Sequence, residues 1–237
     1  MSRKIVAIHQ PNFFPWLGYF DKIVRSDIFI LLDNVQFPKT GGTWTNRVKI
    51  AIGGNSAWAT LPVIRNYSGT RLISEMQINE TTDWRGKLLK TLQTNYGKTP
   101  CFKEIFPLIE PLVMNPTESV AEYNITAIRT LCLLLGINSE KLVLGSTIKV
   151  ERSATDLLIS MTQTLGGTAY MCGGGAEGYQ EDNKFATVGI ELVYQNFKHP
   201  AYQQYKSKEF IPGLSIVDAL MNHGFEGTRN LLYRSNS

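Results

Sequence analysis

Three polar side chains with complementary chemistry lie close together near the start of the chain. His9, Gln10 and Asn12 occur within the segment HQPNFFPWLGYFDK. A neutral imidazole can accept a proton or bond a phosphate, and the two amides can hold a ligand through paired hydrogen bonds. We therefore interpret His9 as a catalytic general base and Gln10 and Asn12 as substrate-binding residues. The alternative is a histidine that packs under the loop and bonds a backbone carbonyl.

The same segment is rich in aromatic residues that could form a stacking wall for a base or a sugar. They are Phe13, Phe14, Trp16, Tyr19 and Phe20. Aromatic side chains at helical spacing more often belong to the core of a protein. We therefore assign only two of them, Trp16 and Tyr19, to substrate binding.

A second polar group follows the second apolar run of the chain, within DNVQFPKTGGTWTNRVKI. Its members are Asp33, Gln36, Lys39, Trp44, Asn46 and Arg47. Asp33 could hold a ribose hydroxyl, orient a cation or act as a second catalytic residue. We assign the other five to substrate binding, because Lys39 precedes a glycine pair that predicts a mobile loop closing over an anion, and Arg47 suits planar recognition. The alternative is an ordinary loop with solvated charges.

A third group is the glycine-rich segment YMCGGGAEGY, which follows an apolar run and precedes a predicted helix. Gly173, Gly174, Gly175 and Tyr179 could contact a donor or a phosphate there, because backbone amides at a helix start bind anions. The segment fits neither GxGxxG nor GxxxxGK[ST], so a plain turn is the alternative. The chain also lacks HExxH, GxSxG and DxD patterns. We therefore expect no metal site and no serine hydrolase.

The elements that position these residues begin with a strand at residues 4–9, a helix at 16–25 and a strand at 28–32. This pattern predicts a βαβ unit, in which ligands bind at the carboxyl ends of the strands. Residues 34–64 predict an inserted antiparallel hairpin, with strands at 46–52 and 56–63 around Gly53, Gly54 and Asn55.

The rest of the chain predicts a helical elaboration followed by a return to alternating strands and helices. The elaboration covers residues 83–136, with helices at 83–96 and 118–135, and Pro107, Pro111 and Pro116 are predicted to break up the stretch between them. Strands are expected at 141–144, 168–172 and 190–195, and helices at 153–165, near Asn183 and at 215–223. The sequence thus predicts one α/β domain over 1–237, with a Rossmann-like, mostly parallel sheet and helices on both faces.

Composition limits the class of protein. Hydrophobic residues make up 43% of the chain and charged residues 19%, which excludes wholesale disorder. The net charge of +4 is scattered along the chain, so we expect a small anionic ligand rather than DNA. The apolar stretch at the N-terminus is too short for a signal peptide or a membrane span, and Cys101, Cys132 and Cys172 form no CxxC pair. We expect a cytoplasmic protein without membrane insertion.

Four blocks of the chain resemble the signature blocks of the WbqC-like family. They are HQPNFFPWLGYFDK, DNVQF with TWTNRVKI, YMCGGGAEGY and FIPGLSIVDALMNHG. That family is associated with bacterial O-antigen and surface-polysaccharide (lipopolysaccharide) gene clusters, and a member has been suggested to be a glycine transferase. The resemblance implies transfer of glycine or a similar acyl group to the amine of a nucleotide-linked amino sugar. It implies no particular catalytic residues.

The leading hypothesis is therefore an amide-forming N-acyl (glycyl) transferase, in which His9 removes the proton of the sugar amine and Asp33 orients. Lys39 and Arg47 would hold phosphate or carboxylate. The donor stays open between glycine with ATP and Mg²⁺, an acyl thioester and glycyl-tRNA, and a homodimer stays open as well. One alternative is a non-catalytic accessory protein that binds a sugar nucleotide. Another is a nucleotide-activating enzyme, because the opening of the chain resembles the nucleotidyltransferase superfamily without its HxGH histidines.

Overall fold

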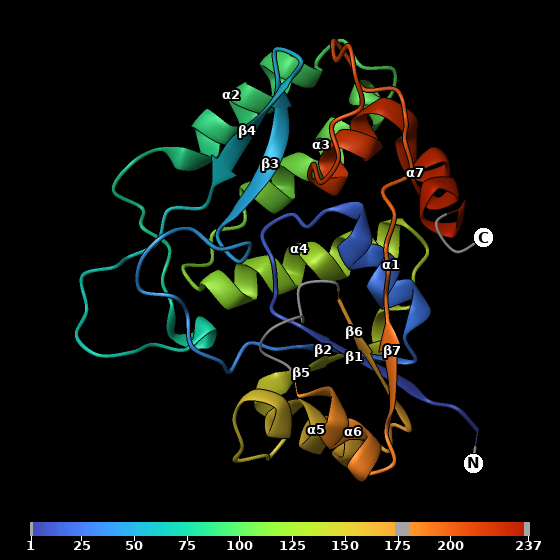
Figure 1. Ribbon diagram of the computed structural model, residues 1–237. Helices are drawn as coiled ribbons and strands as arrows, with labels where there is room; N and C mark the ends of the chain where they lie inside the picture. Colours follow the sequence, from blue (N-terminus) through green and yellow to red (C-terminus); the bar gives the residue numbers. More distant parts are fainter. Residues whose placement is uncertain (1, 174–180, 235–237) are drawn as a thin grey trace.

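Five strands form the central sheet of the protein, for which a computed structural model describes residues 2–173 and 181–234 (Figure 1). They are β1 (Ile5–His9), β2 (Ile28–Leu31), β5 (Leu142–Leu144), β6 (Ala169–Cys172) and β7 (Glu191–Tyr194). All neighbours are parallel, in the order β5-β2-β1-β6-β7. The chain builds outward from β1 to β5 and then returns to add β6 on the other side of β1. Open α/β sheets bind ligands at the carboxyl ends of strands beside such a reversal.

Side chains that alternate along the strands pack into two hydrophobic layers, one on each face of the sheet. Val6 and Ile8 of β1 belong to one buried layer and Ala7 belongs to the other. Strands covered on both faces carry continuous apolar runs, such as IVAIH and IFIL here. Helices lie on both faces as predicted (Figure 1). On one face are α5 (Ala154–Thr164) and α6 (Asp182–Thr187), and on the other are α1 (Leu17–Arg25) and α4 (Val120–Leu134).

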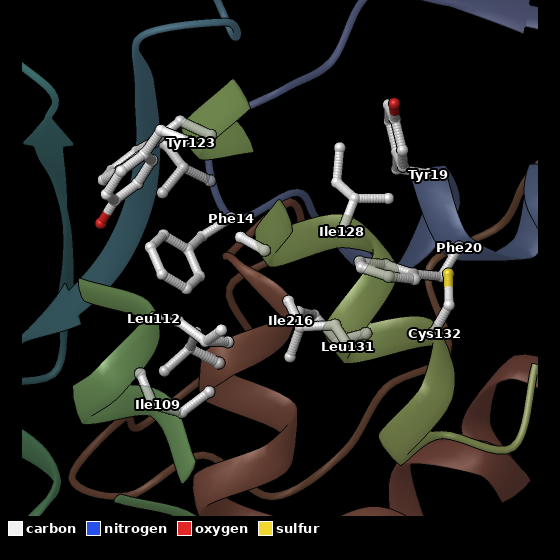
Figure 2. Close-up of a cluster of buried hydrophobic side chains, with 14 of the residues drawn as sticks. Phe14, Tyr19, Phe20, Ile109, Leu112, Tyr123, Ile128, Leu131, Cys132 and Ile216 are labelled. Atoms are coloured by element: carbon white, nitrogen blue, oxygen red, sulfur yellow. The ribbon is translucent and has the colours of Figure 1, made fainter. Parts of the chain in front are cut away.

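The larger layer is the main core. Figure 2 shows Phe14 and Phe20 close to the α4 side chains of Ile128 and Leu131. Ile216, the first residue of α7 (Ile216–Arg234), lies beside them (Figure 2). Gly224 interrupts α7 with a φ of 65°, at the point where the predicted helix ends. The α/β prediction is thus confirmed in both sheet and helices.

The predicted hairpin is also present, as a separate two-stranded sheet. Its strands are β3 (Arg47–Ile52) and β4 (Asn55–Thr60), which pair antiparallel. Gly53 and Gly54 join them with φ angles of 60° and 84°, which side chains with a Cβ rarely adopt. Val48 and Ile50 point into the main core, so the opposite face of the hairpin is turned away from it.

One prediction about the helical elaboration is wrong. Besides α2 (Trp84–Tyr96) and α4, this region contains α3 (Phe102–Val113), which runs through Pro107 and Pro111. Each proline removes one helical hydrogen bond, but both prolines are exposed, so their rings clash with no neighbouring element. The opposite face of α3 buries Ile105, Phe106, Ile109, Leu112 and Val113. Burial of such side chains contributes roughly 1.5 to 3 kcal/mol each, which offsets the proline penalty.

Short 3-10 helices complete the described elements: η1 (Ile73–Glu75), η2 (Ser139–Lys141) and η3 (Gly145–Thr147). Among the described residues, no helix has both the length and the apolar character that a membrane crossing requires.

Candidate functional site

Two cavities lie at the carboxyl ends of the strands, on either side of β1. The first, which we call the aliphatic cavity, has a volume of about 520 Å³, and its apolar wall consists of Leu32, Val35, Leu157 and Leu158. The second, the aromatic cavity, has a volume of about 430 Å³, and its rings come from Trp16, Tyr19, Trp44 and Phe197. His9, Lys22 and Gly173 line both cavities. The two spaces therefore meet at the reversal of strand order between β1 and β6.

His9 ends β1 and stands at this junction. Its Nδ1 lies 3.1 Å from the carbonyl oxygen of Gln10. A carbonyl can only accept, so Nδ1 carries the proton and the lone pair of Nε2 is left for a ligand. Burial, reinforced by the charge of Lys22, lowers the pKa of His9 to about 3. His9 is therefore a neutral hydrogen-bond acceptor at pH 7. Its bond to a backbone carbonyl is also the contact expected if the histidine only packs under the loop.

Lys22 is the second junction residue. It lies on α1, is 3% exposed, and its Nζ donates to the carbonyl oxygen of Ile8 at 3.0 Å. Burial lowers the pKa of its ammonium to about 8, against a smaller opposing effect of Cys172. The described residues that line the two cavities include no carboxylate. An ammonium in such a setting favours an anionic ligand or an anionic transition state.

The aromatic cavity is held together by contacts to the chain after β1. The Tyr19 hydroxyl donates to the same Gln10 carbonyl at 3.0 Å that His9 contacts. The His9 ring packs against Tyr19 with centroids 4.9 Å apart, and against Trp16 at 6.0 Å. Asn196, which also lines the cavity, has a φ of 47°. Asparagine adopts this left-handed backbone more readily than most residues with a Cβ.

The N-terminus of α5 forms part of the wall of the aliphatic cavity. Ala154, the first residue of this helix, lines the cavity with a φ of 49°. The preceding Ser153 makes no side-chain cap, so amide groups of the first turn stay available for a ligand. Asp156 lies in the same first turn and offsets the positive end of the helix, so the Lys22 ammonium is the charge that the two cavities share.

The structure brings five of the predicted site residues to the cavities besides His9. Gln10 lines the aliphatic cavity, and Trp16, Tyr19 and Trp44 line the aromatic cavity. Gly173 lines both, whereas the predictions for Gly174, Gly175 and Tyr179 fall outside the described residues.

Three predicted residues lie within the fold instead. The Asp33 carboxylate accepts hydrogen bonds from the backbone amide and the hydroxyl of Ser146, at 2.8 and 2.7 Å. The Asn46 side chain accepts from the Thr43 amide and donates to the Leu61 carbonyl. Asn12 is 1% exposed, and its Nδ2 has no hydrogen-bond partner among the described residues. None of the three is among the described residues lining either cavity, so we carry no chemical role for them forward.

The remaining predicted residues, Gln36, Lys39 and Arg47, lie on the hairpin and on the loop that precedes it. Gln36 and Lys39 are exposed, and neither lines a cavity among the described residues. The loop that carries Lys39 is tied by Arg65, whose guanidinium donates to the carbonyls of residues 38, 39 and 41 at 2.9, 2.6 and 2.7 Å. Arg47 lies over the ring of Trp58 at 4.3 Å.

Comparison with known proteins gives the identity at the level of family. A family model described as the WbqC-like protein family matches residues 10–230. The chain belongs to this family. It is also 31% identical over 233 residues to the uncharacterized protein Rv1507c of Mycobacterium tuberculosis (strain ATCC 25618 / H37Rv), covering 97% of this chain and 98% of that one. No solved structure matches the chain.

Sequence reasoning missed several residues that line the cavities of this WbqC-like protein. Lys22 is the most important, and its signal was a lysine three positions after Tyr19, on the same side of helix α1. Gln195, Asn196 and Phe197 follow β7, and only the tertiary structure places that strand end beside the site. Among the described residues, no group of three or more His, Cys, Asp or Glu side chains is arranged for a metal ion.

Gly18 offers a first test of the aromatic cavity. A Cβ at this position would lie 2.8 Å from both the Phe197 ring and the Trp16 indole nitrogen. Gly18→Ala should therefore displace two cavity walls, while the gain in helix propensity of up to about 1 kcal/mol limits the loss of stability. We expect a clear drop in the affinity for a UDP-linked amino sugar, measured by calorimetric titration, with a nearly unchanged melting temperature. An unaltered affinity for the sugar nucleotide would show that these walls do not contact the ligand.

Proposed function

We propose that this protein is an N-acyl transferase that joins glycine, or a similar acyl group, to the amine of a nucleotide-linked amino sugar. One observation carries the proposal: two cavities of different character meet at His9 and Lys22. A transferase must bring a donor and an acceptor to one point. The chain also belongs to the WbqC-like family, a member of which has been suggested to be a glycine transferase.

The two cavities suggest which substrate each one holds. Sugars and nucleobases pack favourably against aromatic rings, so we assign the nucleotide-linked sugar to the aromatic cavity. The aliphatic cavity then receives the acyl donor, whose activating group carries phosphate when it is adenylate, coenzyme A or tRNA. The Lys22 ammonium suits that charge.

The proposed reaction is an attack of the neutral amine on the donor carbonyl. As the C–N bond forms, the carbonyl oxygen becomes an oxyanion, and the Lys22 ammonium stabilises it. Nε2 of His9 accepts the proton that the amine nitrogen loses. Collapse of the intermediate breaks the bond to the leaving group, which takes that proton from His9.

The electrostatics of the pair fit this order of events. Burial is the larger cause of the low pKa of His9, and the charge of Lys22 is the smaller one. An oxyanion beside Lys22 cancels that charge, so protonation of His9 becomes easier at the step that needs it.

The test is an assay of glycyl transfer. Wild-type protein is incubated with UDP- or dTDP-linked amino sugars and three donors in turn: glycine with ATP and Mg²⁺, glycyl-coenzyme A, and glycyl-tRNA. Mass spectrometry of the sugar nucleotide should show the addition of one glycyl unit with one donor, and His9→Gln should lose this activity. Tight sugar-nucleotide binding without product from any donor would instead favour an accessory binding protein. Release of pyrophosphate from a nucleoside triphosphate and a sugar phosphate would favour a nucleotidyltransferase.

A further inference from the structure

A row of three tryptophans leads out of the aromatic cavity onto the hairpin. Trp16 lines the cavity and contacts Trp44, with ring centroids 4.8 Å apart. Trp44 also lines the cavity and contacts Trp58 of β4, at 5.4 Å. Trp44 is 39% exposed and Trp58 is 43% exposed. Two large indoles with this exposure, continuous with a cavity, form a surface on which a planar ligand can stack.

Register places cationic side chains on the same face of the hairpin as Trp58. Lys49 is directly opposite Trp58 in the β3–β4 pairing, and Arg47 is two residues before Lys49 on β3. The Arg47 guanidinium lies 4.3 Å from the centre of the Trp58 ring, and the Lys49 ammonium lies 5.5 Å from it. Residues on the other face, such as Val48 and Ala59, are buried in the core.

These two cations have no acidic partner in the part of the chain that the structure describes. Neither Arg47 nor Lys49 forms an ion pair with a described carboxylate. Arg47 nevertheless packs between two groups: the Trp58 ring, and Gly42, where a Cβ would lie 2.5 Å from the Arg47 Nε. The Arg65 clamp ties the loop just before Gly42. The guanidinium of Arg47 and the ammonium of Lys49 are therefore available to bind an anionic ligand on this face of the hairpin.

We propose that this face is a nucleoside-diphosphate subsite, in which the base stacks on Trp58 and the diphosphate contacts Arg47 and Lys49. The Trp44 ring is inclined by 61° to that of Trp58 and meets the base at its edge. The sugar attached to the diphosphate then reaches through the aromatic cavity to His9. The inference rests on the proposed function, because it assumes that the acceptor carries a nucleotide. A single nucleotide matches the size of the surface, since three rings and two cations are fewer than an RNA or a long glycan would need.

The experiment is calorimetric titration of the full chain with UDP, dTDP and uridine, without any acyl donor. Stacking of one base on an aromatic side chain is worth enough that Trp58→Ala should weaken UDP binding about tenfold or more. Trp58→Phe should restore most of the loss, which a general disturbance of the fold would not explain. Arg47→Ala should weaken UDP about ten- to a hundredfold but leave uridine nearly unchanged, because uridine lacks the diphosphate.

Matched controls come from exposed residues on other elements. Tyr233→Ala removes an aromatic side chain of α7 that is 54% exposed, and Lys90→Ala removes an exposed cation of α2. Both should bind UDP like the wild type. Wild-type UDP affinity in both Trp58→Ala and Arg47→Ala would overturn the subsite, and so would the absence of binding by UDP and dTDP to the wild type.

Failure of this proposal can be told apart from failure of the proposed function. If nucleotides bind through Trp58 and Arg47 but no donor yields a glycylated sugar, the subsite stands and the transferase is rejected. If glycyl transfer depends on His9 while the hairpin variants bind UDP normally, the transferase stands and the subsite is rejected.

Discussion

Replacement of Lys22 with methionine should lower glycyl transfer about a hundred- to a thousandfold while making the folded protein more stable. Loss of a single donor to an oxyanion typically has an effect of this size on turnover. The gain in stability follows from burial, which lowers the pKa of the Lys22 ammonium from 10.5 to about 8. That shift corresponds to roughly 3 kcal/mol of destabilisation of the charged form at pH 7, less about 1 kcal/mol for the bond to Ile8.

The pH dependence of the wild type provides an independent readout of the same lysine. Between pH 8 and 10.5 the unfolded chain still binds the Lys22 proton and the folded chain has released it, so stability from this group should rise with pH. Glycyl transfer should move the opposite way, falling as the pH rises above about 8, because neutral Lys22 no longer stabilises the oxyanion. Both trends should be absent in Lys22→Met, when urea unfolding and the transfer assay are repeated across this range.

Lys141 is the matched control for Lys22. It is also a partly buried lysine whose Nζ donates to backbone carbonyls, those of Val24 and Ser26, and burial lowers its pKa as well. It does not line either cavity among the described residues. Lys141→Met should change stability and leave transfer unaltered. Equal effects of the two variants on transfer, or full transfer by Lys22→Met, would remove Lys22 from the chemistry.

Replacement of Asn124 with aspartate should destabilise the protein by about 2 to 4 kcal/mol, although the two side chains have nearly the same shape. The Asn124 amide group on α4 donates to the carbonyls of Pro11 and Thr45, at 2.9 and 2.7 Å, and its side chain is fully buried. It thus joins the loop after β1 to the segment before β3. Aspartate cannot donate when ionised, so two buried carbonyls would lose their partner beside a new charge.

Thermal unfolding measures this effect, with an expected fall of roughly 5 to 15 °C for a chain of this size. UDP affinity should fall too, because Trp44 is adjacent to Thr45 and its carbonyl accepts from the Phe13 amide. Asn95→Asp is the control, since Asn95 also donates to a carbonyl, that of Thr91, but on the partly exposed helix α2. A melting temperature for Asn124→Asp within a few degrees of Asn95→Asp would contradict the stabilising role of the two Asn124 hydrogen bonds.

Local sequence patterns were sufficient to predict several elements of this fold and one residue of the candidate site. The apolar runs at β1 and β2, the helical spacing of α1 and the glycine turn of the hairpin each depend on residues only a few positions apart, and all were predictable. His9 was placed at a strand end by the same reasoning, and the motif blocks indicated the family. Each of these features can be predicted from neighbouring residues, because periodicity and turn geometry are short-range properties of the backbone.

The tertiary structure alone decided how these parts make a site. Strand order brought Gly173 and the residues after β7 beside His9, although no local pattern specifies which strands pair. The folded structure also places Ser146 where it donates a hydrogen bond to Asp33, and it buries Lys22 between the two cavities. Helix α3 formed through two prolines because its far face could be buried. Strand pairing, the desolvation of a side chain and the choice of its hydrogen-bond partner depend on groups that are distant in sequence. These interactions contribute free energy only once the chain has folded.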